Sequence, residues 1–193
     1  MIDVRKNSIL FHAIFTFFLI CTPVFAAITD DPCGCDPVLL QRADAGDVNV
    51  QSYVAFLYAT GKDGVQQNYD KARYWYQRII NHNGADAKII GHANLRMGIL
   101  YNSGKGVKLD YLKAMECYKV AAKQGYYEAH LSIGVLYAQG LGVEKDYNQA
   151  LHWWKIAAHK KQPQAKALIQ LLEKEMDTQS LAFKQNSNEK GNS

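Results

Sequence analysis

The sequence lacks the residue patterns that mark common catalytic and metal sites. It has no Gly-x-Ser-x-Gly nucleophile elbow, no glycine-rich phosphate-binding loop and no His-Glu-x-x-His zinc-protease helix. None of its 6 histidines is spaced as His-x-His or His-x-x-x-His, the spacings that place two imidazoles on one metal ion. We therefore expect no catalytic residue, no metal site and no cofactor.

An excess of charge of one sign is also missing. The chain has 22 Lys and Arg against 18 Asp and Glu, a net charge of +4, and these residues are mixed along its 193 positions. A protein that binds nucleic acid through the phosphate backbone usually gathers its basic residues on one face or in one stripe. The sequence therefore favours a partner other than nucleic acid.

Long apolar runs are absent except at the N-terminus. There, Arg5 and Lys6 precede the run ILFHAIFTFFLIC, which ends at Cys21, and small residues follow at Ala26 and Ala27. This order is typical of an export signal, so we predict a signal peptide over residues 1–26 and a protein exported to the periplasm or secreted. The alternative is an uncleaved anchor, but no membrane insertion is expected once the signal is removed.

Cysteines are few, and three remain after residue 26: Cys33, Cys35 and Cys117. An exported protein can keep disulfides, and an odd number leaves one thiol free or paired outside the chain. In the segment 27–36, the Cys-Gly-Cys sequence could tether the chain to Cys117 or to a second copy, act as a redox pair, or bind a soft metal. A bond between its own two cysteines would close a strained ring. Cys117 itself is expected to be a small buried apolar residue.

A sequence motif recurs through most of the chain. Gly104 to Ala122 reads GKGVKLDYLKAMECYKVAA, and Gly140 to Ala158 reads GLGVEKDYNQALHWWKIAA. A longer first copy carries the extra residue Asp63 in its turn. Three positions recur in all three copies: Tyr58, Tyr101 and Tyr137; Val65, Val107 and Val143; Ala72, Ala114 and Ala150. Self-similarity at a period of about 36 residues indicates a repeat protein.

Each unit reads as a pair of helices. In the first helix, apolar residues recur at steps of three and four, and Gly98 or Gly134 indicates close approach of a neighbour. Gly104 and Gly140 suit left-handed caps at its end. The second helix begins after an N-cap and carries large side chains that we expect in the core rather than on a sugar-binding surface. The N-caps are Asn68, Asp110 and Asp146, and the large side chains are Trp75, Tyr76, Tyr118, Trp153 and Trp154.

The two ends of the array differ from the full units. Residues from Pro37 to Ala45 resemble the end of a second helix, and Gln164 to Met176 resemble a first helix that caps the array, with Glu173 at its tyrosine position. The fold prediction is therefore all-α: an α/α solenoid of about three helix-pair repeats with a C-terminal capping helix, over residues 37–177. The polar residues 178–193 are predicted to form a disordered tail.

Two of the repeated segments resemble the Sel-one-like repeat family, tetratricopeptide-like α/α solenoids of an exported bacterial type. These segments are YNSGKGVKLDYLKAMECYKVAAKQG and YAQGLGVEKDYNQALHWWKIAA. Similarity to related solenoids implies that positions six and two residues before the repeat tyrosine face a concave groove, with amides at its rim. A packing role between repeats is the alternative for these apolar positions. They are Ser52, Phe56, Leu95, Ile99, Leu131 and Val135, with Asn102 and Gln139 at the rim.

The resemblance implies a non-enzymatic adaptor that binds another protein or peptide in this groove, with a role in envelope assembly, envelope stress or host contact. Two alternatives come from other functional classes. One is a weak hydrolase, because some cysteine-rich relatives have been labelled β-lactamases. The other is a thiol-redox or self-assembling structural subunit, a disulfide-linked or self-associated oligomer formed through Cys33 and Cys35.

Overall fold

A computed structural model describes residues 34–159 and 163–190, with side chains as far as residue 180. The predicted signal peptide and Cys33 lie outside these residues. The described part of the chain is entirely helical and contains no strand, so the predicted all-α class is confirmed. Its helices are α3 (Pro37–Asp44), α4 (Val48–Thr60), α5 (Tyr69–Ile80), α6 (Ala87–Ser103), α7 (Tyr111–Lys123), α8 (Tyr127–Gln139), α9 (Tyr147–His159) and α10 (Pro163–Lys190).

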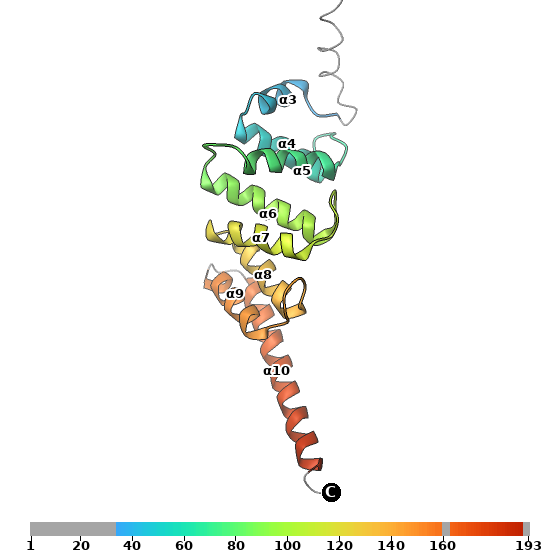
Figure 1. Cartoon of the computed structure of the whole chain (residues 1–193), viewed down its shortest axis with the longest axis vertical. Helices are drawn as coiled ribbons and strands as arrows, with labels where there is room; N and C mark the ends of the chain where they lie inside the picture. The colour runs from blue at the N-terminus through green and yellow to red at the C-terminus, as the bar shows by residue number, and fades with distance from the viewer. Residues whose placement is uncertain (1–33, 160–162, 191–193) are drawn as a thin grey trace, which may run out of the picture.

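The helices stack along one axis, with α3 at one end and α10 at the other (Figure 1). The three predicted units are the pairs α4/α5, α6/α7 and α8/α9, and each helix packs mainly against its neighbours in sequence. This arrangement is an α/α solenoid, as the repeat predicts. The residues inserted between the first and second units lengthen the start of α6, which spans 17 residues against 13 in α4 and α8.

Turn and cap residues form the predicted local structures. Gly104 and Gly140 end α6 and α8 with left-handed φ angles of 66° and 68°. Asn68 and Asp110 cap α5 and α7 by accepting hydrogen bonds from backbone N–H groups at 3.0 Å. The Asp146 carboxylate accepts from Gln149 N at 2.9 Å in α9. Each cap stabilises its helix by about 1 kcal/mol. Because the cap residue recurs, the second helix begins at the same repeat position in every unit.

The helical glycines make room for an aromatic ring of the same unit. A β-carbon on Gly98 would stand 2.6 Å from the Tyr118 ring, and one on Gly134 would collide with the Trp154 indole. The close neighbour that these glycines predict is therefore an aromatic side chain of the second helix, which packs against the first helix. Trp154 adds a hydrogen bond from its indole N–H to the Leu131 carbonyl at 3.1 Å.

The repeated aromatic residues are core residues, with one difference from the prediction. Four are buried, whereas Trp153 is only half-buried. Trp153 differs because its ring stands beside the His130 imidazole, with centroids 5.7 Å apart, at a surface cavity that Lys119 and Lys123 also line. The four buried aromatic residues are Trp75, Tyr76, Tyr118 and Trp154.

The capping helix begins where the sequence predicts but runs further. Ala165 and Leu172 of α10 are buried against the last unit, and Glu173 is exposed at the position of the repeat tyrosine. The predicted disordered tail from residue 178 is wrong as far as Lys190, because α10 continues to that residue. Neither glycine nor proline occurs between residues 164 and 190, and Leu, Ala, Lys, Gln and Glu are good helix formers.

Candidate functional site

The structure places the predicted groove residues on the first helices of the three units. Ser52 and Phe56 lie on α4, Leu131 and Val135 on α8, and all four are half-buried. On α6, Ile99 is 40% exposed, and Asn102 is exposed near the end of the helix. The eighth residue, Gln139, is exposed at the end of α8.

Leu95 differs from the other groove residues because it is only 4% exposed. It belongs to the core of the second unit, where it lies in one cluster with Met115 and Tyr118 of α7. The following helix therefore covers this position, and Leu95 offers no surface to a partner. Its predicted place in the groove is wrong, and the packing alternative is correct for this residue.

Val135 and Gln139 come together in a cavity at the C-terminal end of the stack. The cavity has a volume of about 400 Å³ and lies between α8, α9 and α10. Leucines at steps of three and four along α10 form one wall, and Trp154 and Tyr147 of α9 contribute aromatic surface. The other residues that line it are Ala138, Lys145, Tyr147, Trp154, Leu168, Leu171, Leu172 and Glu175. We call it the C-terminal pocket.

The apolar wall of the C-terminal pocket is open to solvent. Leu171 is 66% exposed, the largest exposure among the large apolar side chains that the structure describes. In the full units a second helix packs over the first, but no second helix follows α10 in the described chain. Leu171 lies 36 residues after Val135 and 72 after Ile99, which is 40% exposed in a full unit, so the half unit exposes the same apolar position further.

Polar groups at the rim of the C-terminal pocket are linked to one another. Tyr147 donates its hydroxyl hydrogen to Glu175 Oε1 at 2.9 Å, and Lys145 Nζ lies 4.5 Å from the centre of the Tyr147 ring. The hydrogen bond with Tyr147 is the main cause that raises the pKa of Lys145. The rim thus presents one ammonium, one carboxylate and the Gln139 amide around an apolar floor. Such an arrangement suits an apolar side chain flanked by main-chain polar groups.

The sequence analysis did not predict the wall that α10 forms in this pocket, although the sequence contains a pattern that indicates it. Leu168, Leu171 and Leu172 follow the helical spacing of an amphipathic stripe, but the stripe by itself does not reveal which leucine stays uncovered. That information depends on the packing of α10 against α9.

The structure describes two of the cysteines, Cys35 and Cys117. Cys35 is buried in the first core cluster, and Cys117 is half-buried at its edge. Burial, with a smaller effect from the Glu116 carboxylate, raises the pKa of the Cys117 thiol to about 11. A thiol that is protonated at neutral pH is a poor nucleophile, which agrees with the structural role predicted for Cys117. Cys33 lies outside the described residues, so its pairing stays a prediction.

The described part of the chain gives little support for metal binding or for hydrolysis by a serine enzyme. No group of three or more His, Cys, Asp and Glu residues there could hold a metal ion. A serine β-lactamase needs a Ser-x-x-Lys motif. This spacing occurs at Ser187 and Lys190, in the last turns of α10. The sequence contains neither Ser-Asp-Asn nor Lys-Thr-Gly, the motifs that complete a serine β-lactamase site, so this spacing does not define one.

Helix pairs stacked in register, with left-handed glycine caps and one aromatic ring per pair, define the class of α/α solenoid repeat proteins. Three segments, residues 49–83, 91–126 and 128–161, match the Sel1 repeat model. Together they cover more than half of the chain, and the protein belongs to the Sel1 repeat family. Proteins of this family are generally adaptors in protein–protein interactions and are typically non-catalytic.

The similar solved structures include proteins of three bacteria. A protective antigen of uropathogenic Escherichia coli with an SLR fold matches 66% of this chain at 28% identity and a TM-score of 0.58, and this chain spans 26% of that protein. A Sel1 repeat protein from Oxalobacter formigenes matches 68% of this chain and 94% of its own at 32% identity, with a TM-score of 0.55.

Cysteine rich protein B of Helicobacter pylori shares the fold, with 21% identity over 68% of this chain and 95% of its own and a TM-score of 0.50. No curated protein sequence matches the chain. Among the described residues, no helix has the length and the apolar character that a membrane span requires.

Proposed function

We propose that this protein is a non-enzymatic adaptor that holds a peptide segment of a partner protein in the C-terminal pocket. The observation that carries the proposal is the exposed apolar wall at Leu171, beside Val135 and Gln139 of the predicted groove. Ile99 and Asn102, the predicted groove residues on α6, are also exposed. In related solenoids the first helices of successive repeats line the binding face.

Binding would depend on one apolar anchor and a few hydrogen bonds. A Leu, Ile or Phe side chain of the partner would contact Leu171 and Val135, and its burial would stabilise the complex by about 1.5–3 kcal/mol. Gln139 would hydrogen bond to the main chain of the peptide at the rim. Lys145 and Glu175 would favour a segment that carries charges of both signs near the anchor.

We also propose that the mature chain is exported, with cleavage after Ala26, and that it acts in envelope assembly, envelope stress or host contact. The basic residues and the apolar run of residues 1–26 support export. The intact mass of the protein from its native cell checks this prediction. A chain that begins at Ala27 agrees with it, and a chain that keeps residues 1–26 in the membrane fraction contradicts it.

The binding proposal is tested with peptides selected from a random display library on the wild-type protein. We expect enriched peptides to share an apolar anchor and to bind Leu171→Asp at least tenfold more weakly in calorimetry. A tenfold loss corresponds to about 1.4 kcal/mol of binding free energy. The variant should fold normally, because the replaced side chain is already 66% exposed.

Leu112→Asp is the matched control. Leu112 is 62% exposed on α7 and does not line the C-terminal pocket, so the same substitution there should leave peptide affinity unchanged. Equal weakening by both variants would show a general effect of charge. Full affinity in Leu171→Asp would place the binding surface elsewhere on the molecule.

A further inference from the structure

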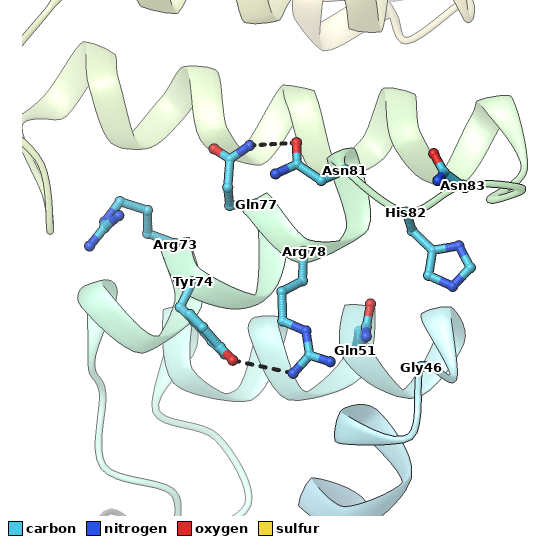
Figure 2. Close-up of a pocket in the computed structure, with 9 residues that line it drawn as sticks. All are labelled: Gly46, Gln51, Arg73, Tyr74, Gln77, Arg78, Asn81, His82 and Asn83. Atoms are coloured by element: carbon cyan, nitrogen blue, oxygen red, sulfur yellow. Dashed lines mark hydrogen bonds between the residues drawn. The ribbon is translucent and has the colours of Figure 1, made fainter.

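A second cavity lies at the other end of the stack, and its chemistry differs from that of the C-terminal pocket. It has a volume of about 430 Å³ and is formed by α4, α5, the turn before α4 and the loop after α5. Figure 2 shows its lining side chains, most of which are polar. They are Gln51, Arg73, Tyr74, Gln77, Arg78, Asn81, His82 and Asn83, with Gly46 at the turn. We call it the N-terminal pocket.

Gln51 is the most deeply buried polar side chain of the N-terminal pocket. It is 1% exposed, and its amide nitrogen donates to the Ala43 carbonyl at 2.8 Å. That bond fixes the orientation of the amide, because a flipped amide would turn an oxygen toward the carbonyl. The buried Gln51 Oε1 is then left with no hydrogen-bond donor in the described structure.

The His82 imidazole presents a second buried atom without a hydrogen bond. Its Nδ1 is buried and has no partner among the described residues, while Nε2 faces the backbone at Gly46. In the view of Figure 2, the Gln51 amide lies between Arg78 and His82. Buried polar atoms are almost always paired in folded proteins, so two such atoms at one cavity point to a group that binds there.

The equivalent positions in the other two units are satisfied internally. Gln51, Asn94 and His130 each lie seven residues before the repeat tyrosine, and all three are buried. Asn94 donates to the Ile90 carbonyl of its own helix, and His130 Nδ1 contacts the carbonyl of Tyr126, the N-cap residue of α8, both at 2.9 Å. Gln51 is thus the exception, because its side chain reaches the Ala43 carbonyl of α3 and its buried Oε1 has no donor among the described residues.

The charges and donors of the pocket restrict what can bind. Gln51 Oε1 accepts hydrogen bonds only, so an ionised carboxylate or a fully ionised phosphate group cannot donate to it. The Arg73 and Arg78 guanidinium groups at the pocket disfavour an ammonium group. A neutral carboxamide satisfies both conditions, because its NH₂ can donate to Gln51 while its oxygen accepts from His82 or Asn81.

Hydrogen bonds hold several of the side chains that line the N-terminal pocket. Arg78 is held by Asp44 Oδ1 at 2.6 Å and donates to the Tyr74 hydroxyl at 3.2 Å, and Gln77 donates to Asn81 at 3.1 Å (Figure 2). These bonds fix the rim. The exposed Tyr74 ring beside the cavity offers apolar surface to the methylene groups of an incoming side chain.

We propose that the N-terminal pocket binds the carboxamide side chain of an Asn or Gln residue in a peptide partner, through Gln51 Oε1 and His82 Nδ1. This site is separate from the C-terminal pocket and does not depend on the function proposed there.

The proposal is tested by nuclear magnetic resonance with the ¹⁵N-labelled full chain. The probes are four blocked tripeptides, acetyl-Ala-X-Ala-N-methylamide, with X as Gln, Glu, Met or Lys, so that only the Gln peptide carries a primary carboxamide. We expect the Gln peptide to shift the side-chain amide signals of Gln51 saturably and to bind at least tenfold more tightly than the other three. Equal binding of the Gln and Met peptides would overturn the proposal without any variant.

Gln51→Met and Gln67→Met form a matched pair of variants. Each wild-type glutamine donates Nε2 to the carbonyl eight residues earlier, but Gln67 is not part of the N-terminal pocket. In Gln51→Met the Ala43 carbonyl keeps its bond from Gly46 N at 3.1 Å, so no buried polar atom loses its partner. We expect this variant to lose the preference for the Gln peptide and Gln67→Met to keep it. A preference retained by Gln51→Met would overturn the assignment.

Discussion

The cavity at the C-terminal end of the solenoid is walled by leucines and two aromatic rings, whereas the cavity at the N-terminal end is walled by amides and arginines. The left-handed glycine caps at the ends of α4 and α8 are nearly the same, with φ angles of 69° at Gly61 and 68° at Gly140. The repeat therefore specifies the frame, while the residues between repeat positions determine what each end can bind. The largest variations occur where a unit has an unusual neighbour, α3 on one side and α10 on the other.

Trp154→Ala should disrupt the wall of the C-terminal pocket and leave the N-terminal pocket unchanged. Trp154 is 4% exposed, covers Gly134 and donates to the Leu131 carbonyl. Its truncation should lower the free energy of unfolding by about 3–5 kcal/mol, measured by urea denaturation. Peptide binding at the C-terminal pocket should be lost, but the Gln51 side-chain amide signals should keep their response to the Gln peptide. Loss of both responses would mean that the two ends are not independent.

Alkaline pH should distinguish the tyrosine-based units from the tryptophan-based one. Burial raises the pKa of both Tyr76 and Tyr118 from 10.0 to about 12. The folded state therefore holds these protons more tightly than the unfolded state, so the stabilisation is complete below pH 10 and is lost as the pH rises to about 12. The loss should be about 2–3 kcal/mol for each tyrosine.

Tyr76→Phe and Tyr118→Phe check this account because neither phenylalanine can ionise. The double variant should show a flatter dependence of unfolding free energy on pH over the same range. A pH dependence equal to that of the wild type would contradict the assignment to these two rings.

Gly134→Ala should produce a smaller effect that sharpens the difference between units. Alanine is the better helix former by about 1 kcal/mol, but its β-carbon would collide with Trp154. We expect a net loss of about 1–3 kcal/mol in the free energy of unfolding, as for other overpacked cores. The first unit carries Ala55 at this position and is buried there without a glycine. A stabilised Gly134→Ala variant would show that the indole moves away at little cost.

Much of the fold could be predicted from the sequence, because the decisive signals are local. Glycine at a left-handed cap, aspartate at an N-cap and an apolar step of three or four depend on neighbouring residues only, and Gly104, Asp110 and Ala165 lie where they were expected. The end of α10 was not predicted, because a polar composition does not by itself exclude a helix that contains no glycine or proline.

The binding surfaces were harder to predict, because exposure depends on which helix covers which residue. Leu95 and Leu171 both follow an apolar helical pattern, yet one is 4% and the other 66% exposed. The same limit applies to Gln51, whose burial depends on α3 lying over the start of α4. The resemblance to related solenoids predicts which helices carry the site, and packing decides which residues on those helices are accessible.

The central claim is that the C-terminal pocket receives a partner protein, and site-specific photo-crosslinking in the native cell tests it most directly. A benzoylphenylalanine residue would replace Leu171 in one strain and Leu112 in another, two leucines of similar exposure. The account predicts one discrete crosslinked product from position 171 that position 112 does not give, and competition by the peptides selected in vitro. The same product from both positions, or no product at 171 with a discrete one at 112, would contradict it.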